Sequence, residues 1–237
     1  MKLKNFILHL AFLLLCNNLV AQEYKNAKEL LEEVSKNYNK KAKFSFFTNM
    51  AIYKNYNDKT PKEKYDGVVI KSDDGVYCKI KGIELLSFND CSLKISNDEK
   101  MILYSDGSQQ DSMVPSDVTL AVFLKDFKWS LKSTSTQYIC EFLPKSITQI
   151  MCSKVIFYIN KNDLNIAKQI TYLTQRVDES NPKKPVKITP MIMVTYKKRG
   201  SVGNSDQLLT NKKNYIIKNG NNVILTKRYS KFQLIKS

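Results

Sequence analysis

The chain has 237 residues and a formal net charge of +16, with 38 lysine and arginine residues against 22 acidic ones. Its only histidine, His9, lies in a leader that we expect to be removed, which would leave the mature chain without imidazole. This excludes Ser-His-Asp and Cys-His catalysis and the usual His-ligated zinc sites. The composition therefore indicates a protein that is not an enzyme, with no catalytic, metal-binding or cofactor-binding residues.

The positive charge comes almost entirely from lysine, because the only arginines are Arg176, Arg199 and Arg228. An exported lysine-rich protein is attracted to anionic surfaces such as lipid head groups. The simpler interpretation is a solvated lysine surface that serves solubility alone. Export argues against nucleic acid, which is the other common partner of basic chains.

Residues 1–21 have the pattern of a secretory signal peptide. Two lysines precede the apolar run 6–15, and Leu19-Val20-Ala21 leads to an expected cut before Gln22. The apolar run is too short to span a bilayer as a helix. Cys16 raises the alternative of a lipoprotein signal, but the residue before it is a large leucine. We therefore expect cleavage after Ala21, a periplasmic location, and a single domain over 22–237.

Four cysteines follow the leader, at 78, 91, 140 and 152. An even number in an oxidising compartment permits two disulfides, and the two close spacings favour Cys78–Cys91 and Cys140–Cys152. The alternative is four buried free thiols that pack as small apolar residues. No CxxC motif is present, so the sequence favours neither a redox site nor a four-cysteine zinc site.

The first mature segment, 25–40, is the clearest helix, with apolar residues at helical spacing and acidic residues opposite. From residue 43 the period changes to two, which predicts strands. A second, short helix is expected at 116–127, capped by Ser116, although a strand there is the alternative. Further strands are expected at 65–71, 76–81, 83–88, 91–96, 101–104, 129–133, 137–143, 154–160, 166–176, 186–198, 214–218, 223–227 and 229–235.

A long antiparallel meander with one or two amphipathic helices predicts an α+β protein that is mostly β. The expected architecture is a strongly curved antiparallel sheet, an unclosed β-barrel. The N-terminal helix and the short helix would pack on its concave face. A curved sheet that is loosely filled by helices leaves an apolar cavity, which is a ligand-binding shape.

The order of several segments resembles the LolA-like family of periplasmic lipoprotein carriers, whose relatives include LolB and RseB. The segments that carry the resemblance are Val20-Ala21-Gln22, Ala27-Lys28-Glu29-Leu30-Leu31-Glu32-Glu33-Val34-Ser35 leading to Tyr38, Phe44-Ser45-Phe46-Phe47, Gly67-Val68-Val69-Ile70-Lys71 before Tyr77, and Val155-Ile156-Phe157-Tyr158-Ile159-Asn160 followed by Ile166-Ala167-Lys168-Gln169-Ile170. The resemblance implies a half-barrel with helices as a lid and acyl chains of a lipoprotein in its cavity. In contrast to those carriers, this chain has no arginine on an early strand.

Apolar residues of the first helix, the first strand and the middle segment are the candidates for lining this cavity. Ordinary core packing is the competing interpretation for each of them, and the two overlap because the wall of a cup is also its core. The candidates are Leu30, Leu31, Val34, Tyr38, Phe44, Phe46, Met50, Ile52, Leu120, Phe123, Leu124 and Trp129.

Two functions are favoured by the sequence, and a third, an enzyme, would need a cleft with convergent carboxylates. The first is an exported monomeric carrier or binder of lipid or lipoprotein acyl chains, which could also meet an anionic membrane surface or an envelope protein complex. The second is a non-catalytic structural or interaction protein of the envelope, with the same fold and a filled core. An apolar cavity favours the first, and a solid interior with an exposed apolar or basic patch favours the second.

Overall fold

The structure is a computed structural model that describes residues 24–107, 125–146, 151–178, 186–220 and 222–236. The leader expected at 1–21 lies outside the described residues. So does most of the short helix expected at 116–127, with the candidate residues Leu120, Phe123 and Leu124.

Twelve strands form one sheet in the order β16-β6-β5-β4-β3-β2-β1-β13-β10-β9-β8-β7. In chain order they are β1 (Phe44–Tyr53), β2 (Glu63–Lys71), β3 (Val76–Ile80), β4 (Ile83–Ser87), β5 (Cys91–Ser96), β6 (Met101–Asp106), β7 (Phe127–Ser133), β8 (Gln137–Pro144), β9 (Cys152–Asn160), β10 (Ile166–Leu173), β13 (Met191–Lys198) and β16 (Gln233–Lys236). All neighbours are antiparallel except β16, which runs parallel to β6.

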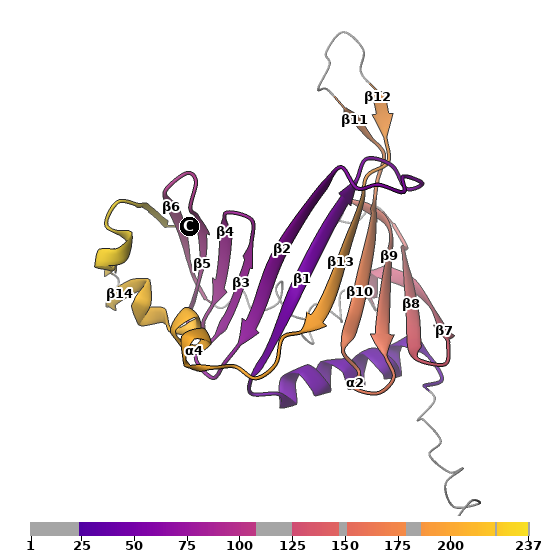
Figure 1. Cartoon of the computed structure of the whole chain (residues 1–237), viewed down its shortest axis with the longest axis horizontal. Coiled ribbons are helices and arrows are strands. Elements are labelled where there is room, and N and C mark those ends of the chain that lie inside the picture. The colour runs from indigo at the N-terminus through magenta and orange to yellow at the C-terminus, as the bar shows by residue number, and fades with distance from the viewer. Residues whose placement is uncertain (1–23, 108–124, 147–150, 179–185, 221, 237) are drawn as a thin grey trace, which may run out of the picture.

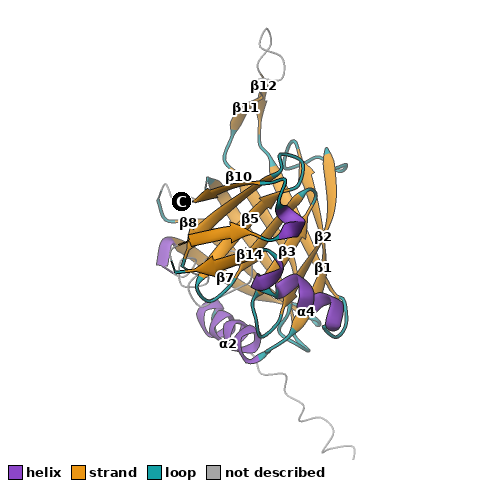
Figure 2. Ribbon diagram, turned by 90° about the vertical axis from the view of Figure 1, so that its left-hand side faces the viewer, coloured by secondary structure: helices purple, strands orange, loops and turns teal. Residues whose placement is uncertain are grey.

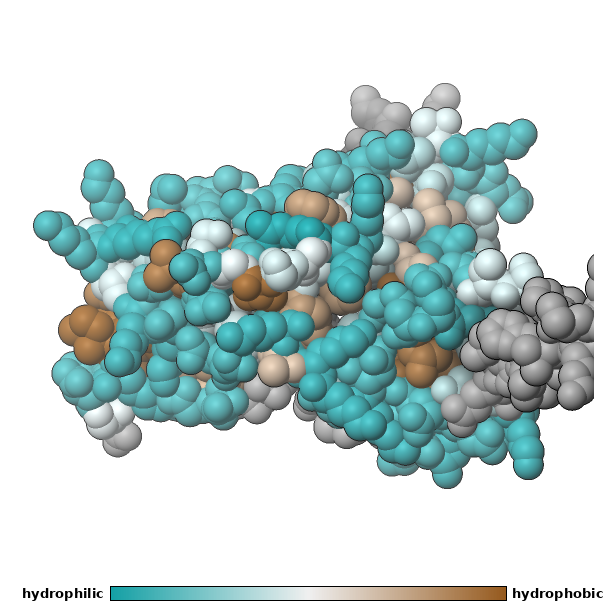
Figure 3. Space-filling model, turned by 60° about the horizontal axis from the view of Figure 1, so that its bottom comes forward, coloured by the Kyte–Doolittle hydropathy of each residue, from teal (hydrophilic) through white to brown (hydrophobic). Residues whose placement is uncertain are grey.

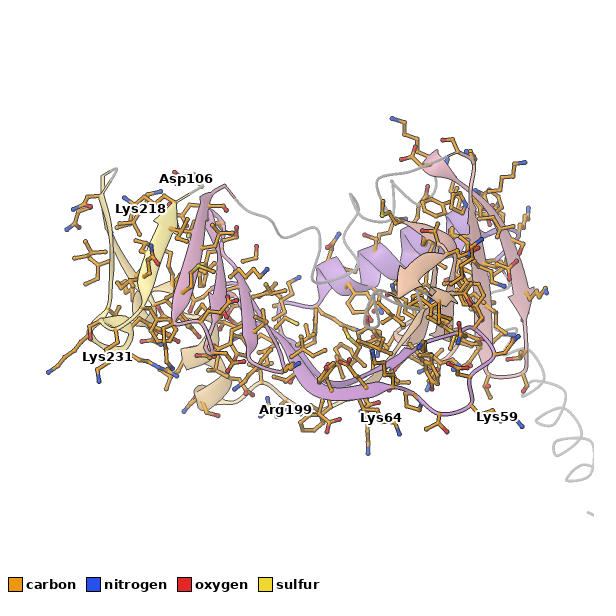
Figure 4. The ribbon with its side chains drawn as sticks, turned by 90° about the horizontal axis from the view of Figure 1, so that it is seen from above. Lys59, Lys64, Asp106, Arg199, Lys218 and Lys231 are labelled. Atoms are coloured by element: carbon orange, nitrogen blue, oxygen red, sulfur yellow. The ribbon has the colours of Figure 1, made fainter. Side chains whose placement is uncertain are left out.

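The sheet is strongly curved and does not close, so β16 and β7 are its two edges (Figure 1). Seen from above, it bends around its inner, concave face, and the helix α2 (Ala27–Lys40) lies inside the bend (Figure 4). The predicted fold class, a mostly β half-barrel with an amphipathic N-terminal helix on the concave face, is therefore confirmed. A small hairpin of β11 (Arg176–Asp178) and β12 (Val186–Ile188) projects beyond the sheet (Figure 2).

The helix α2 begins at a good N-cap. The Asn26 side chain accepts a hydrogen bond from the Glu29 amide at 3.0 Å and donates one to the Glu29 carboxylate at 2.9 Å. The first bond satisfies a backbone donor that a helix start would otherwise leave unpaired, and the second holds the Asn26 side chain in place. The apolar stripe then faces the sheet, and Leu30, Leu31 and Val34 are fully buried against it. The helix is therefore fixed by both local capping and tertiary packing.

Strand alternation divides β1 between two environments. Phe44 and Phe46 point to the inner face and pack with α2, whereas Ala51 and Tyr53 belong to a separate cluster on the outer face. We call the first cluster the α2 core. It joins α2 to the inner face of β1, β7, β8 and β9 through apolar side chains that include Phe127, Tyr138, Phe142, Val155 and Phe157.

The C-terminal segment covers the opposite, outer face at the other end of the sheet. It contains α4 (Asn204–Thr210), η3 (Lys212–Asn214), the hairpin of β14 (Ile216–Asn219) and β15 (Asn222–Leu225), η4 (Lys227–Tyr229) and finally β16. Its side chains Tyr215, Ile216 and Val223 pack against the outer face of β2 to β6. We call this cluster the C-terminal core. Lys218 of β14 is also 2.9 Å from Asp106 at the end of β6 (Figure 4).

Several elements differ from the prediction. No helix or strand is predicted between 198 and 214, where the segment 200–206 is polar, yet α4 begins within this segment and packs against β2 and β3 on the outer face. The strands expected at 166–176 and 186–198 are each divided, because their outer ends form the projecting β11–β12 hairpin. The strand expected at 229–235 begins only at Gln233, after the 3-10 helix η4 and a turn. Within the described ranges, no helix is long and apolar enough to cross a bilayer.

The four cysteines are free thiols, so the disulfides Cys78–Cys91 and Cys140–Cys152 are not formed. Cys78 lies across from Leu85, and Leu85 lies across from Lys94, so Cys91 is three positions further along β5. Strand alternation also places Cys91 in the C-terminal core on the other face. Cys140 lies across from Phe157, five positions from Cys152, or roughly 16 Å along the strand. Bridged cysteines need Cα atoms within about 7 Å.

Candidate functional site

The concave face is the candidate functional site, and it consists of two unlike parts. One part lies under α2, in the half of the sheet formed by β1, β13, β10, β9, β8 and β7, which we call the helix-covered half. The other part is formed by β3, β4, β5, β6 and β16, which we call the open half because, beyond the contact of β3 with the α2 core, none of the described elements packs on its inner face. Strand β2 joins the two halves.

Under α2 the concave face is filled. Six of the predicted cavity residues meet there, and none exposes more than 7 % of its surface: Leu30, Leu31, Val34, Tyr38, Phe44 and Phe46. The Tyr38 ring packs edge-on against Phe44, with centroids 5.5 Å apart. These six residues are therefore buried together in the α2 core.

Polar groups at the edge of the α2 core are paired. The Tyr38 hydroxyl accepts a hydrogen bond from the Ile166 amide at 3.1 Å, and burial raises the pKa of this hydroxyl. The Lys71 ammonium donates to the Tyr38 carbonyl at 3.3 Å and lies 5.8 Å from the Phe44 ring centroid. Burial lowers the pKa of Lys71. The rim of the helix is therefore closed by hydrogen bonds as well as by apolar contact.

Two further predicted residues, Met50 and Ile52, lie on the same inner face but outside the α2 core. Met50 pairs with Val194 and Ile52 pairs with Ile192, and all four are half-buried. Trp129 on the edge strand β7 shares this face, since it lies across from the buried Phe142, and 40 % of its surface is exposed. This apolar surface remains accessible beside the helix.

The open half presents a second apolar surface that the sequence did not single out. Cross-strand pairing places half-buried Cys78, Leu85 and Leu103 in one row on the inner face, with Lys94 between the two leucines. The row ends at Ile235 of β16, which is across from Leu103 and 36 % exposed. A pocket of about 430 Å³ lies over this part of the sheet.

Sequence reasoning missed this surface for an identifiable reason. In the segments 83–87 and 101–106 apolar residues occupy both faces of the strand, which is the pattern of a strand buried on both sides. The C-terminal core covers only the outer face. The signal was therefore present in the sequence, but only the position of the C-terminal segment shows which face stays open.

The thiols of the site are protonated at neutral pH. Burial raises the pKa of Cys78 to about 11 and that of Cys140 to about 12. A thiol with a raised pKa is a poor nucleophile and a poor metal ligand, because both roles need the thiolate. Among the described residues, no group of three His, Cys, Asp or Glu side chains is placed to hold a metal ion.

No protein-family model matches the sequence, and no curated protein matches it significantly. Solved structures do resemble it. An uncharacterized conserved protein from Thermus thermophilus aligns with 89 % of this chain and 99 % of its own, at 11 % identity and a TM-score of 0.49. A LolA superfamily protein from Nitrosomonas europaea aligns with 80 % of this chain and 100 % of its own, at 11 % identity and a TM-score of 0.37.

A third structure comes from Vibrio parahaemolyticus and is provisionally described as an outer membrane lipoprotein-sorting protein domain. It aligns with 78 % of this chain and 100 % of its own, at 9 % identity and a TM-score of 0.36. At these identities the similarities concern the fold, and the half-barrel architecture rests on the strand order and curvature described above.

Proposed function

We propose that this protein is an exported, non-enzymatic carrier or binder of lipid or lipoprotein acyl chains. The chains would lie on the concave face outside the α2 core. The observation that carries the proposal is the continuation of this face, with accessible apolar side chains, on both sides of the filled core. Transfer of an alkyl chain from water to such a surface contributes about 0.8 kcal/mol per CH₂ group.

The accessible surface beside α2 supports the proposal for the helix-covered half. Met50, Ile52, Val194 and Ile192 are only half-buried although all four are apolar and adjacent. Ordinary core residues of this sheet, such as Phe142 and Ile159, are fully buried. Apolar residues left accessible on a concave face are typical of ligand sites.

The test compares two substitutions on neighbouring positions of β13. Val194→Asp places a charge on the inner face, whereas Met193→Asp places it in the outer-face cluster, at a similar degree of burial. Both proteins are purified from the periplasm and measured by native mass spectrometry with lipid extraction, and by uptake of a fluorescent fatty acid. We expect the wild type and Met193→Asp to bind lipid and Val194→Asp to lose at least tenfold in affinity.

A second function, an envelope interaction protein, is favoured by exposed apolar residues on the C-terminal segment. Leu208 is 62 % exposed, and Ile217 and Ile224 lie across from each other on the outer side of the β14–β15 hairpin. Seen from below, hydrophobic patches break a mostly hydrophilic surface at the end of the molecule that carries this segment (Figure 3). A clean apo mass with no fatty acid uptake would contradict the carrier proposal and favour this alternative.

A further inference from the structure

The open half of the concave face carries a lysine in an otherwise apolar row. From β2 to β16 the residues that lie across from one another are Val69, Cys78, Leu85, Lys94, Leu103 and Ile235. The neighbours of Lys94 within its own strand, Leu93 and Ile95, point to the other face and are buried in the C-terminal core. Lys94 therefore stands on the inner face with a leucine on each side, and it is exposed.

The pocket over this row has the size and lining of a small amphiphile site. Its volume of about 430 Å³ is within the range of about 300–1,000 Å³ that is usual for small-molecule sites. Four aliphatic side chains contribute to its wall: Ile83, Met101, Leu103 and Ile235. The wall also contains charged residues. Lys94 lies within strand β5, whereas Lys81, Asp98 and Glu99 lie in or beside turns.

Of the two lysines that line this pocket, Lys94 is the one available to a ligand. The Lys81 ammonium is 3.2 Å from the Tyr65 hydroxyl and 4.7 Å from the centroid of the Tyr65 ring. Within the described part of the chain, Lys94 makes no ion pair or hydrogen bond through its side chain. An anion bound at Lys94 would form an ion pair with its ammonium group.

The acidic residues of the pocket set the position of such an anion. Asp98 and Glu99 lie in the β5–β6 turn, at the same end of the pocket as Lys81 and Gly82. Lys94 is two positions further into the strand than Ser96, roughly 7 Å away from that end. An anionic group would be repelled near the turn and attracted at Lys94, while an alkyl chain could lie on the aliphatic wall.

We propose that the open half is a second binding compartment, specific for an amphiphile with one alkyl chain and an anionic head group paired with Lys94. This inference rests on the proposed function, and it adds the charge of the ligand and the residue that recognises it. About two strand spacings separate Lys94 from Cys78, which packs at the edge of the α2 core. The compartment is thus distinct from the surface around Ile52 and Val194.

The experiment uses cis-parinaric acid and its methyl ester, which share one chain and differ in charge. Binding is followed by probe fluorescence, below the micelle concentration, for the mature wild type, Lys94→Met, Lys94→Arg and Lys79→Met. Methionine keeps a straight apolar side chain and removes the charge. Lys79 is the matched control, because it is exposed on the outer face of β3, two strands from β5.

We expect the wild type to bind the acid about tenfold more tightly than the ester, as a charge-assisted pair in an apolar setting allows. Lys94→Met should lose this preference through weaker binding of the acid alone, Lys94→Arg should keep it, and Lys79→Met should match the wild type. Lysophosphatidic acid should displace the acid from the wild type. The concentration of lysophosphatidic acid that displaces the probe shows whether the site prefers a phosphate head group to a carboxylate.

Three results would overturn the inference. Equal binding of acid and ester by both wild type and Lys94→Met would remove the role of Lys94 while leaving the proposed function intact. Displacement of the probe by millimolar inorganic phosphate would assign the site to a small anion and not to an amphiphile. Failure of every protein to bind either probe would contradict the proposed function itself, and the inference with it.

Discussion

The two halves of the sheet are buried from opposite sides. In the helix-covered half, α2 packs on the inner face, whereas in the open half the C-terminal segment packs on the outer face. Strands β2 and β3 lie where the cover changes sides, and both faces are buried there: Val69 and Ile70 on β2, Val76 and Tyr77 on β3. One curved sheet is therefore packed along its whole length, although no other described element covers the inner face of β4, β5, β6 and β16.

The difference follows from the needs of a sheet that has two apolar faces. Each strand needs at least one face packed against another layer, and a single helix of 14 residues is too short to cover twelve strands. The C-terminal segment stabilises the remaining strands from outside. Its last strand, β16, also pairs with β6, so the backbone groups on that side of β6 are hydrogen-bonded within the sheet.

The largest expected effect separates the filled core from the surface of the C-terminal segment. Leu31→Ala removes a fully buried side chain of α2 and should lower the free energy of unfolding by about 3 kcal/mol, because it leaves a cavity. Leu208→Ala should change it by less than about 0.5 kcal/mol, since that side chain is mostly exposed. Urea unfolding measures both. Equal losses would contradict the assignment of α2 as core.

The attachment of the C-terminal segment should be the next most sensitive feature. The Asp206 carboxylate is nearly buried, lies 2.6 Å from the Arg199 guanidinium and accepts a hydrogen bond from the Gly203 amide at 3.1 Å. Arg199 in turn reaches Ser45 of β1. Asp206→Ala should cost about 2 kcal/mol, because it leaves a half-buried cation and an amide unpaired.

Hydrogen exchange provides the local readout for Asp206→Ala. Amides of β14 and β15 should exchange faster while those of α2 keep their wild-type rates, since the two cores lie on opposite faces. Glu32→Gln is the control, because the Lys28–Glu32 pair is 3.9 Å long and exposed and should contribute within about 0.5 kcal/mol. Uniform acceleration in both halves would show that the two cores unfold as one unit.

The rate of thiol modification should differ between Cys78 of the open half and Cys140 of the helix-covered half. Cys78 is half-buried in the open half, and its pKa is raised to about 11, whereas Cys140 is fully buried in the α2 core with a pKa near 12. Cys78 should react with a disulfide reagent at pH 8 about tenfold faster or more, because reaction needs thiolate and access. Peptide mapping of the labelled protein checks this. Without reductant, the unfolded mature protein should yield four thiols.

The raised pKa values of the Cys78 and Cys140 thiols also predict how the free energy of unfolding changes with pH. A thiol whose folded pKa lies above its ordinary value of 9.0 favours the folded state fully below pH 9. That contribution should decline as pH rises from 9 through 11 to 12, where the folded thiols ionise. Urea unfolding between pH 8 and pH 11 should show a monotonic loss, and replacement of Cys140 by alanine should make it shallower.

The smallest expected changes in stability concern two buried serines, and we expect them to have opposite signs. The Ser87 hydroxyl is fully buried on the inner face and has no hydrogen-bond partner within the described residues, so Ser87→Ala should stabilise the protein by about 1 kcal/mol. The Ser72 hydroxyl is 2.5 Å from that of Thr210 on α4. Ser72→Ala should therefore destabilise by a similar amount. Thermal unfolding resolves both.

Much of the fold is readable from the chain. The helical spacing of Leu30, Leu31 and Val34 predicts a helix at 25–40, within two residues of the observed bounds of α2. Alternation predicts most strands of the meander. Local signals fail at 200–206, where a polar sequence forms α4 because Asp206 and Thr210 find buried partners in the folded protein. They fail also for the cysteines, since sequence spacing carries no information about register and face.

By itself the sequence determined an amphipathic helix near the N-terminus and a series of antiparallel strands, because these depend on residue identity and short-range periodicity. Only the tertiary structure decided which face of each strand is covered, which apolar candidates are buried under α2, and that Lys94 stands in an apolar row on the open half. The physical reason is that alternation assigns side chains to two faces of a strand, while the layer that covers a face can come from a distant part of the chain, as residues 204–236 do for the outer face of β2 to β6.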